Sequence, residues 1–309
     1  MRVVFMGSGA FAIPSFEVLV DAGHGVAALV TQPDREKGRG RALAPPALKP
    51  VAEARGVKVL QPNRVREAEA QAALRALAPD VQVVVAYGQL LPRAVIDIPR
   101  FGTVNVHASL LPRYRGAAPI AWAIAKGETE TGVTTMLLDE GLDTGPVLLR
   151  RATPIAPEET AAELTPRLAR LGADLLLETL RDMERGALRP EPQDPVQATL
   201  APILRKEDGR LDWRQPAPAL ACRVRGFNPW PGTFTTWAGS RLAVWRAREA
   251  PGRASAVGKI LGREGDSLLV GCGSGTTLAL TEVQPEGRKR MSGAAFALGA
   301  RPGPDARFE

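Results

Sequence analysis

The sequence has 309 residues and a formal net charge of +7, and its 45% hydrophobic and 24% charged residues are typical of a globular protein of two domains. No apolar run approaches the roughly 20 residues that a membrane-spanning helix needs, and no basic-then-apolar leader precedes the first strand pattern, so we expect a cytoplasmic protein without membrane segments. Two cysteines and two histidines stand in no ligand spacing, so we expect no metal.

The first half of the chain alternates short apolar runs with helical patterns. Helices are predicted over residues 11–22, 47–55 and 67–77. Strands covered on both faces are predicted over residues 3–6, 26–30, 57–60, 81–86, 104–107 and 133–138. This alternation predicts an α/β fold with a Rossmann-like, doubly wound, mainly parallel sheet, whose site lies at the carboxyl ends of the strands.

A glycine-rich turn follows the first strand. Residues 7–12 match the G-x-G-x-x-A pattern of dinucleotide-binding folds, but the same glycines suit any tight strand–helix turn. The acid that would bind a ribose at the end of the second strand is missing, because Pro33 directs the chain into a loop before Asp34. The pattern therefore gives little support for NAD(P) binding.

Residues 34–46 form a loop where such a fold usually needs about two to six residues. The loop carries Arg35, Lys37, Arg39 and Arg41 and leaves from the carboxyl edge of the predicted sheet. Long loops inside a compact domain tend to be functional. We interpret this one as closing over an anionic polymer at the active site, and a merely solvated insertion is the alternative.

Asn105 and His107 are the candidate catalytic pair. Their i, i+2 spacing at the end of a predicted strand places both side chains on the same face. Asp143 follows the next predicted strand, 36 residues after His107, and falls at the same edge of the sheet. For His107 alone, a hydrogen-bonded core histidine would be the simpler interpretation, so the site depends on all three residues.

The second half of the chain has a different sequence pattern. A long helix is predicted over residues 161–185, followed by a Pro-rich polar linker over residues 189–203. A short helix over residues 217–225 then precedes five predicted strands, over residues 233–237, 242–248, 258–263, 267–271 and 277–283. These strands favour a small OB-like β-barrel. We therefore predict a catalytic domain over residues 1–188, the linker over residues 189–203, and a C-terminal domain over residues 204–309.

The net charge lies entirely in the last third of the chain. Residues 1–204 contain 23 basic and 23 acidic side chains, whereas residues 205–309 contain 17 basic and 10 acidic ones. A neutral body with a basic appendage indicates an anionic partner, and solubility alone is the alternative. We expect Trp213, Trp230, Trp237 and Trp245 to be core residues rather than base-stacking platforms.

With these residues assembled, the sequence resembles the folate-dependent formyltransferases. Asn105, His107 and Asp143 look like the catalytic triad of that family, within the signature that continues through Ser109, Leu110, Leu111 and Pro112. Further stretches that carry the resemblance are residues 31–35, 38–40, 86–92, 115–120, 140–145 and 227–231. The resemblance runs from the first strand into the C-terminal domain, and after about residue 291 it gives no guidance.

The resemblance implies a reaction and its two substrates. Over its full length the chain is most similar to family members that transfer the formyl group of 10-formyltetrahydrofolate to the α-amino group of initiator methionyl-tRNA. Asn105 and His107 would stabilise the oxyanion that forms when the amine attacks the formyl carbonyl, and Asp143 would orient the imidazole. By the same resemblance, Arg39 would engage the acceptor end of the tRNA.

The resemblance also implies where the folate binds. The pterin would contact backbone groups of residues 85–91, and the pocket would include Tyr87, Gly88, Gln89, Leu90, Ser109, Leu110, Leu111, Pro112 and Asp139. No metal is needed, and we expect a monomer. Formyl transfer to a sugar-nucleotide amine or to glycinamide ribonucleotide stays open as an alternative, as does an RNA-binding module whose enzyme domain is vestigial.

Overall fold

The computed structural model of the chain describes residues 1–37, 42–252, 254 and 256–309. Its contacts divide the chain into two compact units. The N-terminal unit comprises Met1–Gly116, Thr131–Thr153 and Thr165–Leu200, and the C-terminal unit comprises Ala117–Glu130, Pro154–Leu164 and Ala201–Glu309. The domain boundaries proposed from the sequence, at residues 188 and 203, stay a prediction.

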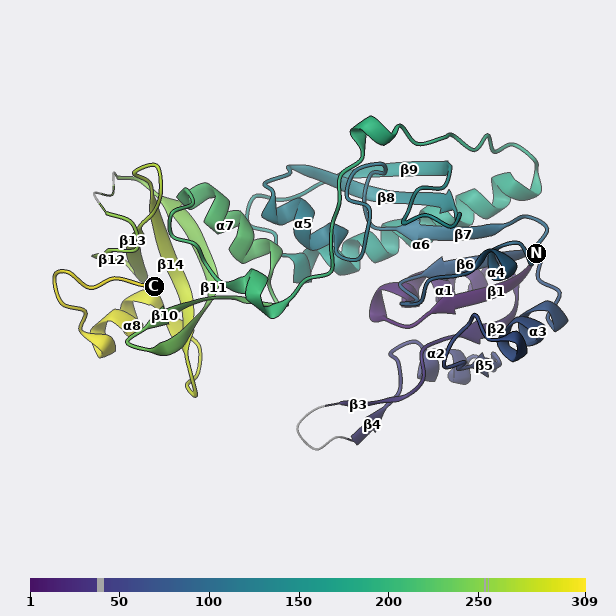
Figure 1. Cartoon of the computed structure of the whole chain (residues 1–309), viewed down its shortest axis with the longest axis horizontal. Coiled ribbons are helices and arrows are strands. Elements are labelled where there is room, and N and C mark those ends of the chain that lie inside the picture. Colours follow the sequence, from purple (N-terminus) through teal and green to yellow (C-terminus); the bar gives the residue numbers. More distant parts are fainter. Residues whose placement is uncertain (38–41, 253, 255) are drawn as a thin grey trace. The chain divides into compact units, whose positions relative to one another are not determined.

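A seven-stranded sheet forms the N-terminal unit, in the order β5-β2-β1-β6-β7-β8-β9 (Figure 1). Its strands are β1 (Arg2–Gly7), β2 (Gly25–Val30), β5 (Val59–Leu60), β6 (Val81–Val85), β7 (Thr103–His107), β8 (Glu130–Leu137) and β9 (Val147–Pro154). The pairs β1–β2, β1–β6, β2–β5 and β6–β7 are parallel, and β7–β8 is antiparallel. The predicted mainly parallel sheet is therefore confirmed. Its order reverses beside β1, which creates the switch point where doubly wound folds bind ligands.

The predicted helices of this unit are present. They are α1 (Ile13–Asp21), α2 (Lys49–Ala54), α3 (Ala68–Ala76) and α6 (Ala161–Glu184). The last of these passes very close to the strands that carry the site, because a Cβ atom on Gly172 would lie 2.9 Å from a Val106 methyl carbon and 3.3 Å from one of Val133. Close backbone approach of this kind fixes β7 and β8 beneath the helix.

Several elements of the N-terminal unit escaped the sequence prediction. The loop over residues 34–46 contains a hairpin of β3 (Arg35–Lys37) and β4 (Ala42–Ala44), which Figure 1 shows extending away from the sheet. The short α4 (Arg93–Ile96) and the edge strand β9 were also missed. The two hairpin strands consist of Arg, Glu, Lys, Ala and Leu, which carry little β-propensity, so only the pairing reveals them.

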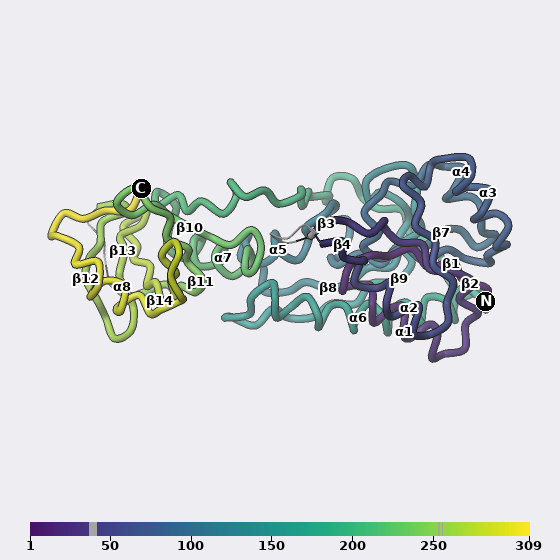
Figure 2. The backbone as a smooth tube through the Cα atoms, turned by 90° about the horizontal axis from the view of Figure 1, so that it is seen from below, coloured from purple at the N-terminus to yellow at the C-terminus, as the bar shows by residue number. Residues whose placement is uncertain are grey.

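The C-terminal unit contains an antiparallel sheet in the order β10-β11-β14-β13-β12, with β15 paired to β14. Its strands are β10 (Thr233–Trp237), β11 (Ser240–Ala250), β12 (Ile260–Glu264), β13 (Ser267–Gly271), β14 (Thr277–Pro285) and β15 (Met291–Ser292). Two helices pack on the sheet, α7 (Ala217–Gly226) on β11 and α8 (Gly293–Ala300) on β14 (Figure 2). A further helix, α5 (Pro119–Ala125), packs on α7. The predicted strands and α7 are present, whereas α5 and α8 were not predicted, and an OB-like closure of the sheet stays a prediction.

The tryptophans of the C-terminal unit divide between core and surface. Trp213 is buried and stacks on Phe308 with ring centroids 5.5 Å apart, and Trp237 packs against the edge of the same phenylalanine. The core prediction is wrong for Trp230, whose side chain is 54% exposed. Within the residues that the structure describes, no helix is both long and apolar enough to cross a membrane.

Candidate active site

The carboxyl end of β7 carries Asn105 and His107, and strand alternation gives them the same face of the sheet. Asn105 is 9% exposed and His107 is 6% exposed. The parallel and antiparallel registers place Asn105 between Val84 and Met136, and place His107 opposite Thr134. Both side chains are therefore largely withdrawn from solvent, where interactions with charge are stronger than in water.

Two groups fix the imidazole of His107. Its Nε2 lies 2.9 Å from the carbonyl oxygen of Tyr114, and its Nδ1 lies 3.7 Å from Oδ2 of Asp143. Because a carbonyl oxygen can only accept, Nε2 carries the hydrogen and donates it. In the neutral ring Nδ1 is then the acceptor, and it faces the Asp143 carboxylate.

Asp143 is held in a tight turn between β8 and β9. Its Oδ2 accepts a hydrogen bond of 2.8 Å from the amide of Gly116, and its own backbone is left-handed, with φ of 53°. The turn is closed by Asp139, whose Oδ1 accepts from the amide of Gly141 at 3.0 Å and from the hydroxyl of Thr144 at 2.7 Å. Asp139, proposed from resemblance as a folate residue, is thus also a structural support for the loop that carries the candidate acid.

The carboxamide of Asn105 is the least engaged polar group of the cluster. Among the residues that the structure describes, it makes no hydrogen bond with the protein, although it is nearly buried. The amide atoms of Asn105 are not among the fully buried side-chain atoms that lack a partner, so the amide reaches the surface of the site and is available to a ligand. The structure thus brings the three candidate catalytic residues into one cluster, with Asn105 free to donate.

The segment after β7 is shaped by Thr134. The Thr134 hydroxyl donates to the carbonyl of Ser109 at 2.7 Å and accepts from the amide of Leu111 at 3.1 Å. Ser109 is fully buried and its hydroxyl donates to the carbonyl of Arg113, while Leu111 packs in the core. Leu110 and Pro112 are half-buried, so at these positions the candidate folate contacts are backbone and aliphatic groups.

The loop after β6 is anchored by the glycine-rich turn. The carbonyl of Tyr87 accepts hydrogen bonds of 3.1 Å from the hydroxyl of Ser8 and from Nε2 of Gln32. Its ring is buried, and burial raises the pKa of Tyr87 to about 12. The Gln89 side chain accepts from the amide of Val65 at 2.8 Å and so holds a neighbouring loop.

Two further residues of this loop differ in their exposure to solvent. Leu90 is 85% exposed, and Gly88 has a left-handed backbone with φ of 86°. The backbone of the loop and the Leu90 side chain, rather than the Tyr87 ring, are therefore the surfaces that a ligand can reach.

The basic loop residues proposed for tRNA can be placed only in part. Arg35 is exposed on β3 and donates to the side chain of Gln32 at 3.0 Å. Lys37 ends the same strand. Arg39 and Arg41 lie outside the described residues. At the base of the hairpin, Asp34 pairs with Lys49 at 2.9 Å, and hydrogen bonds from Gln61 and Lys49 lower the pKa of Asp34.

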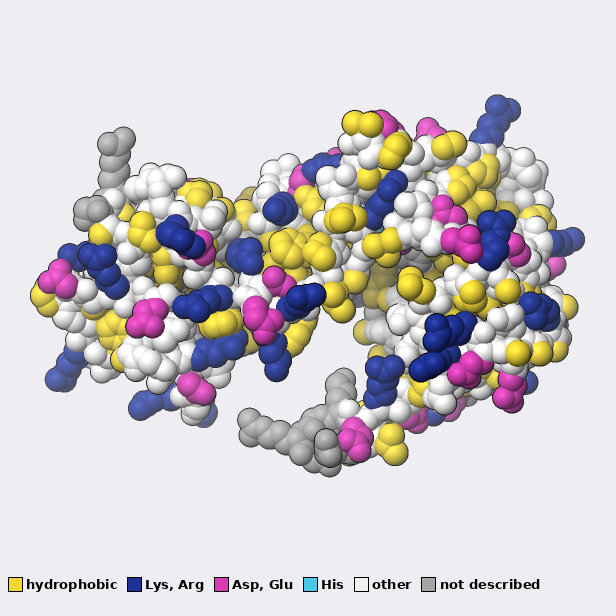
Figure 3. Space-filling view, viewed as in Figure 1, with side chains coloured by type: hydrophobic (Ala, Val, Ile, Leu, Met, Phe, Trp, Pro, Cys, Tyr) yellow, Lys and Arg dark blue, Asp and Glu magenta, His cyan; other side chains and the backbone are white. Residues whose placement is uncertain are grey.

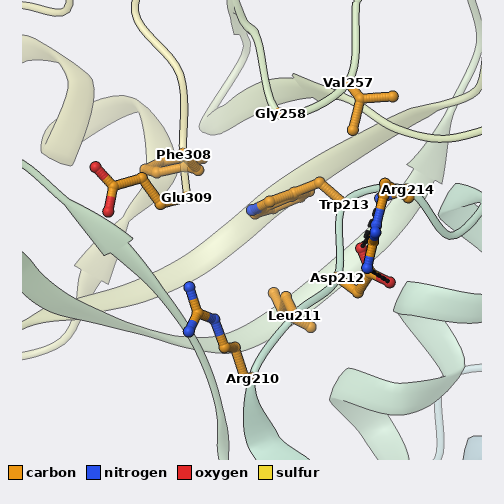
Figure 4. A pocket seen from close by; sticks show the side chains of 9 residues that line it. All are labelled: Arg210, Leu211, Asp212, Trp213, Arg214, Val257, Gly258, Phe308 and Glu309. Atoms are coloured by element: carbon orange, nitrogen blue, oxygen red, sulfur yellow. Dashed lines mark hydrogen bonds and ion pairs between the residues drawn. The ribbon is translucent and has the colours of Figure 1, made fainter.

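On the face drawn in Figure 3, the basic side chains of the C-terminal unit are scattered among acidic and apolar ones and form no single patch. A cavity of about 410 Å³ also lies in this unit (Figure 4). Its wall is the stacked pair Trp213 and Phe308, and its rim holds Arg210 and the ion pair of Arg214 with Asp212. None of the predicted catalytic or folate residues lines it, so it is separate from the candidate active site.

Several residues that support the site were not predicted from the sequence. Ser8 donates to the Tyr87 carbonyl, Thr134 accepts from the Leu111 amide, and the Tyr114 carbonyl contacts His107. Gln193 donates to the Asp143 carbonyl, and Thr199 accepts from the Tyr114 amide. Ser8 stands in a motif that the sequence did single out, whereas the others act through backbone groups and leave no local pattern. Within the described residues, no group of three His, Cys, Asp or Glu side chains could hold a metal.

The N-terminal unit carries an Asn–His–Asp cluster at the carboxyl edge of a Rossmann-like sheet, and an antiparallel C-terminal unit follows it. Comparison with known proteins assigns a chain of this kind to a family. Residues 1–180 match the formyl transferase family, and residues 203–301 match the formyl transferase C-terminal domain. The chain belongs to the formyl transferase family, and it is a transferase of one-carbon formyl groups.

Two relatives that match this chain over nearly their full length are named methionyl-tRNA formyltransferase. The methionyl-tRNA formyltransferase of Solibacter usitatus is 54% identical over 97% of this chain and 96% of its own length. That of Anaeromyxobacter dehalogenans is 53% identical over 97% of both chains. The crystal structure of WlaRD, a sugar 3N-formyl transferase, in the presence of dTDP and 5-N-formyl-THF, matches with a TM-score of 0.68 at 15% identity. It covers 94% of this chain and 99% of its own, and this likeness shows the shared fold.

Proposed function

We propose that this protein transfers the formyl group of 10-formyltetrahydrofolate to the α-amino group of initiator methionyl-tRNA, the step that prepares this tRNA for translation initiation. The observation that carries the proposal is the unpartnered Asn105 amide beside an imidazole whose free nitrogen faces Asp143. The full-length relatives named methionyl-tRNA formyltransferase support this acceptor over a sugar-nucleotide amine. The sugar formyltransferase likeness concerns the fold alone.

Asn105 serves as the donor that stabilises the developing charge. Attack of the neutral amine on the formyl carbonyl places negative charge on the carbonyl oxygen. A carboxamide donates to that oxygen without changing its own protonation state, and being free of protein partners it loses no hydrogen bond in doing so. The strand pairing on both sides fixes the backbone of Asn105 before the substrates arrive, so only the side chain has to adjust to the oxyanion.

His107, supported by Asp143, accepts the proton of the attacking amine. Because Nε2 is committed to the Tyr114 carbonyl, the proton that the attacking amine loses can be accepted only at Nδ1. When the bond between the formyl carbon and the folate nitrogen breaks, that proton is returned to the nitrogen, and tetrahydrofolate leaves. The Asp143 carboxylate, 3.7 Å from that nitrogen, stabilises the imidazolium that results. At this separation a bound water or the substrate amine can bridge the two groups.

The two substrates approach from surfaces of different chemistry. We place the folate against the backbone of residues 85–91, the exposed Leu90 side chain, the segment from Ser109 to Pro112, and the turn closed by Asp139. The hairpin bearing Arg35, Lys37, Arg39 and Arg41 and the basic residues 205–309 supply positive charge for the tRNA phosphates. We further propose that the protein acts as a monomer in the cytoplasm, where initiator tRNA is charged.

The test is a formyl-transfer assay from 10-formyltetrahydrofolate with four acceptors. These are initiator methionyl-tRNA, an elongator tRNA carrying the same methionyl ester, a UDP-amino sugar, and glycinamide ribonucleotide. We expect transfer to initiator methionyl-tRNA to exceed the others in kcat/KM by orders of magnitude. Preferred transfer to the sugar nucleotide would overturn the assignment of the acceptor, and no transfer to any amine would overturn the enzyme assignment for this substrate set.

A further inference from the structure

Residues 191–200 follow α6 in the N-terminal unit, within the segment that the sequence predicts to be a Pro-rich linker. We call residues 191–200 the brace. It is fastened at its start by two backbone hydrogen bonds of 2.8 Å between Glu191 and Val147 and by an ion pair of 2.7 Å between Glu191 and Arg150. Its middle is a short 3-10 turn, Pro195–Gln197, capped by the side chain of Asp194.

The Gln193 side chain connects the two turns that meet at Asp143. Its Nε2 donates to the carbonyl of Asp143 at 2.8 Å and to the carbonyl of Gly145 at 2.7 Å. Its Oε1 accepts from Nε and Nη2 of Arg115, at 3.0 and 2.8 Å. All four hydrogen-bonding positions of the amide are therefore used. The residue after Arg115, Gly116, in turn donates to the Asp143 carboxylate, which closes a ring of contacts around the candidate acid.

Thr199 holds the other partner of His107. Its hydroxyl accepts from the amide of Tyr114 at 2.9 Å, and its carbonyl accepts from the amide of Arg115 at 2.8 Å. Tyr114 has a left-handed backbone with φ of 61°, and its carbonyl is the group that receives the Nε2 hydrogen of His107. A tyrosine in this conformation needs external support, because its side chain disfavours it.

The brace thus contacts both groups that fix the imidazole. Apolar packing does not explain its position, since Val196 is 90% exposed and Leu200 is 70% exposed. We propose that Gln193 and Thr199 are positioning residues for formyl transfer, which hold the Asp143 carboxylate and the Tyr114 carbonyl at the distances His107 requires. This inference rests on the proposed function for its kinetic tests and on the geometry of His107 for its spectroscopic test.

The kinetic test compares two glutamines of the same segment. Gln193→Ala removes the four contacts above, whereas Gln197→Ala removes only a hydrogen bond to Asp194 and serves as the matched control. We expect Gln193→Ala to lower kcat by roughly 10- to 100-fold, because small displacements of reacting groups are costly, with the KM values of tRNA and folate within about twofold. Gln197→Ala should retain the unaltered kcat.

Thr199 provides a rescue test that does not depend on Gln193. Thr199→Val removes the hydroxyl that receives the Tyr114 amide and should lower kcat, whereas Thr199→Ser keeps the hydroxyl and should restore it. Thermal melting of each variant identifies any that fails to fold. If Gln193→Ala unfolds, Gln193→Glu retains the size and the acceptor for Arg115 but places a carboxylate against two carbonyls, and it should show the same kcat loss.

A double-substitution cycle separates positioning from general support. If Gln193 acts through Asp143, then Gln193→Ala should add less than about twofold to the loss caused by Asp143→Ala alone. Losses that multiply would overturn the proposal. So would equal losses in Gln193→Ala and Gln197→Ala, or a rise in the KM of tRNA with kcat unchanged.

A spectroscopic test needs no turnover and so separates failure of the brace from failure of the proposed function. The chain has only two histidines, so the nitrogen NMR signals of His107 can be assigned with a His24→Gln variant. We expect the signals of the Nε2-protonated form in the unaltered protein, a change for His107 but not for His24 in Gln193→Ala and Thr199→Val, and none in Gln197→Ala. His107 signals unaffected by the first two substitutions would refute the positioning role.

Discussion

Replacing Asn105 by alanine isolates the proposed oxyanion donor. Loss of one preorganised donor of this kind costs about 100- to 1,000-fold in kcat, equivalent to about 2.7–4 kcal/mol of transition-state stabilisation. Because Asn105 has no hydrogen-bonded partner among the described residues, the substitution leaves no protein group unsatisfied. We therefore expect the free energy of unfolding to change by about 1 kcal/mol or less, so that nearly the whole effect falls on catalysis.

A nearby substitution with the opposite signature provides the control. Thr134→Val removes a buried hydroxyl that accepts from the amide of Leu111 and donates to the carbonyl of Ser109. Leaving such groups unsatisfied costs about 1–3 kcal/mol of folding stability. Asn105→Ala should therefore be stable and slow, whereas Thr134→Val should be measurably less stable.

The measurements are single-turnover formyl transfer, tRNA binding and denaturant unfolding on the same preparations. We expect Asn105→Ala to keep its affinity for initiator methionyl-tRNA and its unfolding midpoint while kcat falls at least 100-fold. A kcat within about threefold of the unaltered protein would refute the donor role. A loss of stability as large as that of Thr134→Val would show instead that the amide has a structural partner.

Three further tests address the loop after β6, the core of the C-terminal unit and the basic loop of residues 34–46. Burial raises the pKa of Tyr87 from its ordinary value of 10.0 to about 12, so above pH 10 the unfolded chain loses this proton first and stability falls as pH rises; Tyr87→Phe should flatten that decline in melting temperature between pH 10 and 12. Burial also raises the pKa of the Cys272 thiol to about 12, so in the native protein a maleimide should label the half-exposed Cys222 and leave Cys272 unlabelled until unfolding; labelling of both at native rates would contradict the burial argument. Arg39→Ala should raise the KM for tRNA or lower kcat with folate affinity unchanged, and weakened folate binding would assign the loop another role.

The sheet could be predicted from the sequence because its strands are buried on both faces and therefore read as continuous apolar runs. β6 and β7 are buried at every position, and their predicted bounds differ from the observed ones by one residue at most. After two buried positions, the edge strand β9 alternates half-buried and exposed positions and includes Arg150 and Arg151, so it was not predicted. In the hairpin of β3 and β4, residues 35, 36, 42 and 43 are exposed, so no buried face produces a pattern in the sequence.

The candidate catalytic pair was predictable for a different reason. Asn105 and His107 depend only on strand alternation, which is fixed by local geometry. The approach of Asp143 to His107 depends on a left-handed turn and on the amide of Gly116, which lie 27 residues apart in the chain. The order of the predicted strands placed Asp143 at the same edge of the sheet, and the resemblance gave it a catalytic role. Spacing alone could not predict its 3.7 Å separation from His107 or the direction of its carboxylate.

The role of the brace could not be predicted from the sequence, because its composition is typical of a linker whereas its side chains support the site. Proline-rich, polar and exposed residues indicate a linker, and the segment does follow the last helix of its unit. The Tyr114 conformation costs about 1–2 kcal/mol for a residue with a Cβ atom, and a carbonyl so oriented persists only where neighbouring contacts fix it. Each hydrogen bond that Thr199 accepts contributes about 1 kcal/mol, so the two from the Tyr114 and Arg115 amides are enough to offset that strain. The prolines then have a function of their own, since a chain with fewer backbone states loses less entropy when Gln193 and Thr199 are held against the site. The same residues that make the segment resemble a tether therefore suit it to hold His107 in one tautomer.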